Sequence, residues 1–187
     1  MLSCDNSGSD AQSKDSDTST LSQEEKEMYI NKGKTIAKET FLTLSSNLKA
    51  KMMEGGVVNA VEYCNMAAYP LTDSIAKANN ATLRRVSDRL RNPINNPDEV
   101  EMGVIENYKE LLASEGQLKP VVIKEDGNIR FMAPILLKPA CLSCHGTPEK
   151  HISGSDLAFI RELYPKDEAI NFSTGDLRGI WSITFLE

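Results

Sequence analysis

Three residues of one short segment have the types and the spacing to do chemistry: Cys141, Cys144 and His145. They form a C-x-x-C-H motif, which is typical of the covalent attachment of a c-type haem. Two thiols three positions apart can each add to a vinyl group of the same haem, and the imidazole that follows can ligate the iron. The motif therefore indicates thioether bonds from Cys141 and Cys144, with His145 as the proximal iron ligand.

Two other kinds of site use a C-x-x-C pair. A structural zinc site needs two further ligands, usually a second C-x-x-C pair or two histidines. His151 supplies one of them, but the sequence has no second pair. A thioredoxin-like redox pair opens a helix after a strand, whereas here Pro139 precedes the motif and Gly146 and Pro148 follow it. These residues are typical of a loop built around a cofactor.

Composition restricts the class of protein further. The chain has 187 residues, of which 40% are hydrophobic, enough for one domain with a hydrophobic core. A net charge of -6 and a pI near 5.1 argue against nucleic-acid binding, which usually requires a basic surface. No apolar run approaches the ~18 residues of a membrane span, so we expect contact with a membrane only through a lipid anchor.

Residues 1–22 form a polar tail rich in Ser, Thr and Asp. Such a segment buries too little apolar surface to offset its ordering entropy, so we expect it to be disordered. Leu2-Ser3-Cys4 resembles the end of a bacterial lipoprotein signal, although the hydrophobic region that should come before it is missing. We expect a tether lipidated at Cys4, followed by one domain over 23–187. The alternative is a free cysteine near a disordered end.

A capping box of Ser22 and Glu25 predicts the start of a long helix. Apolar residues then recur three, four or seven positions apart until about Met53, and Gly55-Gly56 ends the pattern. A helix of about thirty residues is long for a globular protein. It either packs along its own domain or provides the surface of a homodimer.

A second helix is expected over 57–68, and its periodicity places Cys64 on the apolar face among small residues. From periodicity alone, an ordinary buried thiol is the simplest interpretation, because cysteine is commonly buried. A short third helix is predicted over 70–78. The long helix and these two shorter ones make the N-terminal half of the domain helical.

The C-terminal half alternates between strand and helix patterns, which predicts an α+β fold with a small antiparallel sheet. A hairpin signal precedes the motif, and Pro134 places the second hairpin strand at an edge or a bulge. The expected strands are 82–86, 119–124, 129–136 and 180–187, and the expected helices are 98–115 and 155–164.

Two adjacent arginines, Arg84 and Arg85, lie in the first predicted strand and therefore face opposite sides of the sheet. Guanidinium groups pair well with carboxylates, so both are candidates to contact the propionates of a haem. The alternative is solvated surface charge.

Beyond the motif, several stretches resemble a bacterial family, the c-type haem PAS-like domains, long catalogued as a domain of unknown function. The resemblance extends over most of residues 25–187. The resemblance implies a PAS-like antiparallel sheet with a helical N-terminal half, and one haem attached outside the cytoplasm. The stretches are Arg84-Arg85-Val86-Ser87 with Arg91-Asn92-Pro93, Pro139-Ala140-Cys141-Leu142-Ser143-Cys144-His145-Gly146, Tyr164-Pro165-Lys166-Asp167-Glu168-Ala169, and Gly175-Asp176-Leu177-Arg178-Gly179-Ile180-Trp181-Ser182.

The resemblance also implies a second axial ligand. In the best-characterised members a cysteine of an N-terminal helix ligates the iron, and Cys64 in Glu62-Tyr63-Cys64-Asn65 matches that position. The alternatives are Met66, His151 and an open position. Met66 lies off the apolar face that carries Cys64, and His151 follows His145 too closely to reach the opposite side of the ring.

A His/Cys ligand pair predicts sensing. A thiolate is a strong anionic donor, so it favours ferric iron, and its bond should weaken on reduction and free a position for CO or NO. We expect a redox or small-gas sensor in the periplasm or on the outer face of a bacterial membrane, signalling to an unidentified partner protein. The alternative is a single-haem periplasmic electron-transfer protein. An enzyme such as a peroxidase is not expected, because only His151 is left as an acid-base group.

Overall fold

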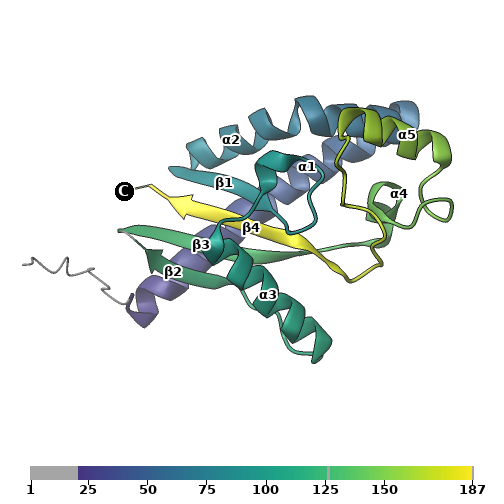
Figure 1. Cartoon of the computed structure of the whole chain (residues 1–187). Helices are drawn as coiled ribbons and strands as arrows, with labels where there is room; N and C mark the ends of the chain where they lie inside the picture. The colour runs from purple at the N-terminus through teal and green to yellow at the C-terminus, as the bar shows by residue number, and fades with distance from the viewer. Residues whose placement is uncertain (1–20, 126, 187) are drawn as a thin grey trace, which may run out of the picture.

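A computed structural model describes residues 21–125 and 127–186 (Figure 1). The tether predicted over 1–22, including Cys4, lies almost entirely outside the described residues. Two single 3-10 turns, Pro93–Asn95 and Pro139–Cys141, accompany the main elements. Within the described ranges the α-helices and β-strands are α1 Gln23–Met66, α2 Ala68–Ala78, β1 Ala81–Val86, α3 Glu99–Ala113, β2 Val121–Glu125, β3 Asn128–Leu136, α4 Leu142–His145, α5 Gly154–Leu163 and β4 Leu177–Phe185.

The strands form one antiparallel sheet in the order β1-β4-β3-β2, which confirms the predicted α+β class. β2 pairs with β3 only as far as Met132, so β3 has a single neighbour at Pro134, and its register with β4 shifts between Ile135 and Leu136. The edge or bulge predicted from Pro134 is confirmed. β4 begins at Leu177, earlier than the predicted 180, because Leu177 still pairs with Leu136 beyond that shift.

Each face of the sheet has its own hydrophobic core. On one face α1 and α2 cover the aromatic side chains of Phe131, Trp181 and Phe185. Gly33 of α1 lies directly against this face, since a Cβ built there would be 2.2 Å from the Phe131 ring. On the other face α3 packs Ile105, Tyr108 and further apolar side chains against the sheet. The sheet is therefore the middle layer, with α1 and α2 on one side and α3 on the other (Figure 1).

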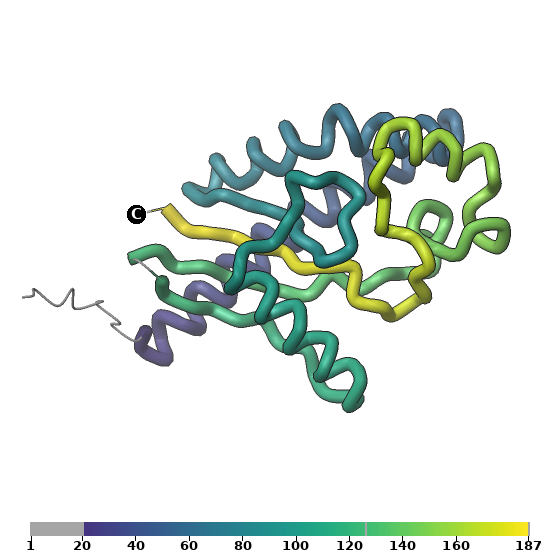
Figure 2. Tube along the Cα trace, viewed as in Figure 1, coloured from purple at the N-terminus to yellow at the C-terminus, as the bar shows by residue number. Residues whose placement is uncertain are grey.

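α1 is continuous except for a kink at Gly55 and Gly56. Gly56 has φ 69° and ψ -152°, which glycine adopts far more readily than other residues. The two helices predicted on either side of these glycines are thus the two halves of α1. Figure 2 shows the first half running along the sheet, while the second half approaches α5. The kink therefore separates a sheet-bound half from the half that carries Cys64.

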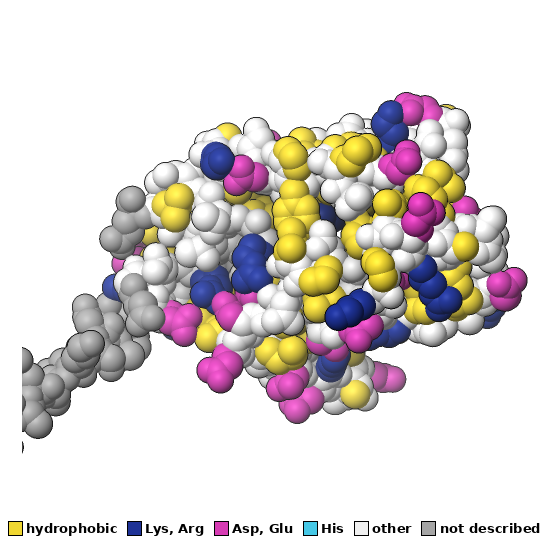
Figure 3. Space-filling view, turned by 45° about the horizontal axis from the view of Figure 1, so that its top comes forward, with side chains coloured by type: hydrophobic (Ala, Val, Ile, Leu, Met, Phe, Trp, Pro, Cys, Tyr) yellow, Lys and Arg dark blue, Asp and Glu magenta, His cyan; other side chains and the backbone are white. Residues whose placement is uncertain are grey.

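The surface is mixed in character. On the face shown in Figure 3, acidic and basic side chains are interspersed, and hydrophobic side chains gather at the end that carries α5. Of the helices in the described residues, none is both long enough and apolar enough to span a bilayer.

Candidate functional site

The C-x-x-C-H motif follows β3 at the end of the sheet that α5 covers. The sequence predicts a loop here, but the structure has the 3-10 turn Pro139–Cys141 followed directly by α4. Helical spacing places residues three apart on one side of a turn, and both Cys141 and Cys144 are partly exposed free thiols. Cys141 packs against a small core of Leu137, Ala169 and Phe172, whereas Cys144 packs against the core beneath α5.

His145 is held in one orientation and one tautomer. Its Nδ1 lies 2.8 Å from the carbonyl oxygen of Ala169, and because a carbonyl only accepts, Nδ1 carries the proton and leaves the Nε2 lone pair for a metal. The ring meets Phe172 edge-on, with centroids 6.3 Å apart. Burial lowers the pKa of His145 well below its usual value, and the nearby charges of Arg178 and Arg91 lower it further. The imidazole is therefore neutral, which is the form that ligates iron.

The fold brings Cys64 to the motif from far away in the sequence. Cys64 is a partly buried free thiol in the second half of α1, which contacts both α4 and α5. Burial raises its pKa, while Arg85 and Arg91 oppose that rise. The pKa of Cys144 is raised to about 11, chiefly by burial, with a contribution from Cys64. Cys144 also packs in the same hydrophobic cluster as Val57 and Val61, which belong to the second half of α1.

The other two candidates for the distal position lie elsewhere. The Met66 side chain is 69% exposed at the end of α1. His151 folds back on the loop after the motif, where its Nδ1 accepts the backbone N–H of Thr147 at 3.0 Å. A zinc site would require three or more convergent His, Cys, Asp or Glu side chains, and the described part of the chain contains no such group.

Arg84 and Arg85 do face opposite sides of the sheet, as the strand predicts, and their surroundings differ. Arg84 is on the α3 face, where it forms an ion pair with the buried Glu101 at 3.0 Å and donates to the Asn96 carbonyl. Arg85 is on the other face, next to Trp181 in the strand register, and its charge acts on both Cys64 and His145. Arg85 is thus on the face that α1 covers, where its charge affects the pKa of Cys64 and of His145, and Arg84 is paired with a carboxylate on the α3 face.

Three further arginines around the motif carry no role in the sequence prediction: Arg89, Arg91 and Arg178. The Arg89 guanidinium lies 3.9 Å from the centroid of the Phe172 ring. Arg178 donates to the Ser87 hydroxyl at 2.7 Å and to the Arg89 carbonyl at 3.0 Å. Arg91 and Arg178 belong to stretches that carry the family resemblance, which is the signal that could have identified them.

These arginines make the site electropositive. Burial, followed by the charge of Arg91, lowers the pKa of Arg178 to about 10, and a guanidinium with that pKa is still charged at neutral pH. Among the described residues, Arg85, Arg89 and Arg178 have no carboxylate within ion-pair distance. A ligand that brings carboxylates would complement this charge.

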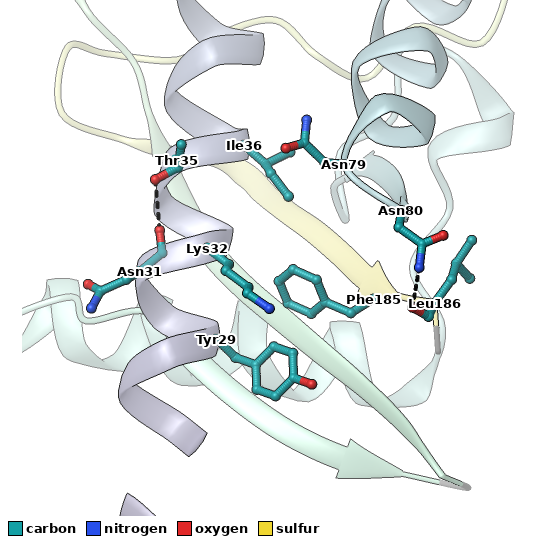
Figure 4. A pocket seen from close by; sticks show the side chains of 9 residues that line it. All are labelled: Tyr29, Asn31, Lys32, Thr35, Ile36, Asn79, Asn80, Phe185 and Leu186. Carbon is teal, nitrogen blue, oxygen red and sulfur yellow. Dashed lines mark hydrogen bonds between the residues drawn. The ribbon is translucent and has the colours of Figure 1, made fainter. Parts of the chain in front are cut away.

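The side chains gathered here fit a c-type haem. Two thiols are available for vinyl groups, a neutral imidazole has a free Nε2, a third thiol lies nearby, and cationic groups can pair with propionates. A separate pocket of about 470 Å³ lies between the first half of α1 and the end of β4, with Ile36 and Phe185 among its lining residues (Figure 4). None of the predicted site residues lines that pocket.

Comparison with known proteins agrees with the fold and the motif. The sequence profile of the Tll0287-like family matches residues 11–185, and the chain belongs to that family. The crystal structure of the cyanobacterial heme-protein Tll0287 is similar, with a TM-score of 0.53 and 21% sequence identity, over 79% of this chain and 92% of that one. This likeness shows a shared fold. No curated protein matches the chain. The resemblance noted in the sequence is confirmed at the level of family and fold.

Proposed function

We propose that the protein is an extracytoplasmic c-type haem protein that senses redox state or a small gas, with His145 and Cys64 as axial ligands. The single observation that carries this proposal is the arrangement of His145. Its Nδ1 is committed to the Ala169 carbonyl, Nε2 is left for iron, and two free thiols stand in the same motif. The solved structure with the same fold is named as a heme-protein, which supports the choice of ligand.

The residues have distinct roles in this proposal. Cys141 and Cys144 anchor the haem covalently, and His145 is the proximal ligand held by Ala169. Arg85 and Arg178 pair with propionates, in place of Arg84. Haem supplies iron that changes oxidation state and binds diatomic gases such as CO and NO. Cys64 stabilises the ferric state as a thiolate, because an anionic donor favours the higher charge on the metal.

The kink in α1 supports sensing. Cys64 belongs to the half of α1 after Gly55 and Gly56, whereas the first half is packed on the sheet. Loss of the Cys64 bond on reduction would let the second half move while the first half stays in place. A sensor needs such a coupling between ligand state and a movable element. The receiver is a partner protein or a second copy of this chain.

The alternative proposal is single-haem electron transfer. It is favoured by the partial exposure of Cys141, Cys144 and His145, since an electron carrier needs its haem edge near the surface. In a carrier Cys64 remains bound in both oxidation states. Neither proposal assigns an enzymatic reaction. We also propose a location in the periplasm, or on the outer face of a membrane through lipidated Cys4. This part of the proposal is supported by the likeness of Leu2-Ser3-Cys4 to the end of a lipoprotein signal and by the family resemblance.

The test is the visible spectrum of protein matured in a periplasm that has haem-attachment machinery. We expect covalent haem, a low-spin ferric spectrum with thiolate character, and CO binding only after reduction. Cys64→Ala should lose the thiolate character, while the exposed neighbour variant Met66→Ala should keep it. Ferric and ferrous spectra that are both six-coordinate and unaffected by CO would contradict sensing and favour electron transfer.

A further inference from the structure

A buried ion pair contacts the backbone groups that hold His145, the proposed proximal ligand. Arg91 follows β1, and Asp167 follows α5, 76 positions later in the chain. The Arg91 guanidinium binds both carboxylate oxygens, with Nε–Oδ1 at 3.1 Å and Nη2–Oδ2 at 3.0 Å. The exposed fractions of the two side chains are 12% and 1%. The pair is therefore bidentate and largely shielded from water, where charge interactions are strong.

The pair also holds two backbone segments next to the histidine, one at Cys144 and one at Ala169. Arg91 Nη2 donates to the carbonyl oxygens of Cys144 and Ala169, the latter at 3.2 Å. Asp167 Oδ1 accepts the N–H of Ala169 at 2.9 Å. Ala169 is thus fixed through its N–H by the carboxylate and through its carbonyl by the guanidinium. The same carbonyl accepts the Nδ1 proton of His145 at 2.8 Å.

This chain of contacts has an electronic consequence for His145. A carbonyl that already accepts from a cationic guanidinium is a weaker acceptor for Nδ1–H, so the imidazole keeps less imidazolate character and donates less electron density to a metal. The positive charge of Arg91 also favours the less charged, ferrous state, whereas the negative charge of Asp167 favours the ferric state. The two members of the pair therefore act on the iron with opposite signs.

We propose that Arg91 and Asp167 are positioning residues that fix His145 through Ala169 and set the reduction potential of the haem iron. This inference rests on the proposed haem site. It assigns the pair a role beyond stability: the guanidinium raises the potential and the carboxylate lowers it. A purely structural pair would lack this opposition, because loosening the loop from either side would disturb His145 in the same way.

The experiment compares reduction potentials of haem-loaded wild-type protein, Arg91→Gln, Asp167→Asn and the double variant. Arg91→Gln should shift the equilibrium toward ferric iron by about threefold or more, ~28 mV for one electron, and Asp167→Asn should shift it toward ferrous iron. In the Asp167→Asn background, adding Arg91→Gln should again lower the potential. That step keeps the test valid even if Arg91→Gln alone fails to fold, because it leaves no unpaired buried carboxylate.

The matched control is Arg84→Gln with Glu101→Gln, an Arg–carboxylate pair on the α3 face of the sheet. It should reduce the melting temperature and leave the potential unchanged. Potentials that shift in the same direction in both single variants, or that stay at the wild-type value with haem normally bound, overturn this inference alone. Absence of haem from the wild-type protein overturns the proposed function, and this inference with it.

Discussion

The α3 face of the sheet and the motif end differ in how their arginines are paired. On the α3 face, Arg84 meets the buried Glu101, and Arg130 meets Asp98 at 2.7 Å. At the motif end, Arg85, Arg89 and Arg178 lie near the motif without a carboxylate in the described part of the chain at ion-pair distance. The two arginines on the α3 face thus have carboxylate partners within the polypeptide. The three at the motif end have none among the described residues, and their positive charge would suit an anionic ligand.

The two regions differ in whether the chain itself supplies the carboxylate that pairs with each arginine. A carboxylate supplied by the chain itself, such as Glu101, stabilises the helix it caps and the strand beside it. Guanidinium groups that have no internal carboxylate partner and lie near free thiols would suit a ligand that brings carboxylates. Arg91 is the exception at the motif end, since its partner Asp167 is internal and both hold the backbone around His145.

The largest expected effect tests the motif end directly. Replacing Cys141 and Cys144 together by Ser removes both thiols that form thioether bonds, so no haem should stay attached after denaturation. Haem staining of a denaturing gel measures this. Cys64→Ser is the matched control and should keep covalent haem, because Cys64 only ligates the iron. Persistent covalent haem in the double variant would contradict the assignment.

On the α3 face, Glu101→Ala should destabilise the fold by about 2–3 kcal/mol, since it removes a capping box and an ion pair that is buried on one side. Chemical denaturation of the haem-free protein measures the loss. Glu99→Ala, an exposed acidic residue of the same first turn, should cost about 0.5 kcal/mol. The visible spectrum of the haem-loaded form should be unchanged in both variants, and a changed spectrum would remove the distinction between the two regions.

Arg85→Gln and Arg84→Gln sharpen the comparison within a single strand. Arg85→Gln should weaken retention of non-covalent haem by the Cys141→Ser, Cys144→Ser protein by about tenfold, as expected for loss of a charge-assisted hydrogen bond of about 1.5 kcal/mol. Haem titration followed by absorbance gives the dissociation constants. Arg84→Gln should leave the affinity unchanged and lower only the stability. Equal losses of affinity would show that neither face is specialised.

The smallest effect is confined to alkaline solution. Tyr108, in the core of the α3 face, donates its hydroxyl to the Lys119 carbonyl at 2.8 Å, and burial raises its pKa to about 12 from a usual value of 10. The folded state favours the neutral phenol, so this stabilisation is complete below pH ~10 and is lost as the pH rises toward 12. Denaturation midpoints measured across that range should fall. Tyr108→Phe should reduce the slope, and an unchanged slope would contradict the assignment.

Local signals in the sequence predicted the elements well. The capping boxes at Ser22 and Asp98 are present, and the Gly55-Gly56 boundary appears as a kink, because these features depend on neighbouring residues only. Strand periodicity correctly puts Arg84 and Arg85 on opposite faces, but a period of two cannot tell which face α1 covers and which face α3 covers. The sequence predicts a loop at the motif, yet the motif forms a helical turn in contact with α1.

The part of the site that the sequence does not predict depends on contacts between segments that are far apart in the chain. Arg91 and Asp167 are far apart in sequence, and neither residue type nor spacing identifies them as partners. The packing of the second half of α1, which carries Cys64, beside Cys144 likewise follows from the direction that α1 takes after its kink. For Cys64, periodicity alone is equally consistent with an ordinary buried thiol, and the distal-ligand role that the family resemblance implies stays a prediction.

The most direct test of the account is a crystal structure of the haem-loaded protein in the ferric state. We predict thioether bonds from Cys141 and Cys144, with His145 Nε2 and Cys64 Sγ on opposite sides of the iron and a propionate paired with Arg85 or Arg178. A structure in which Cys64 points away from the iron, and another residue or none occupies the distal position, would contradict the central claim.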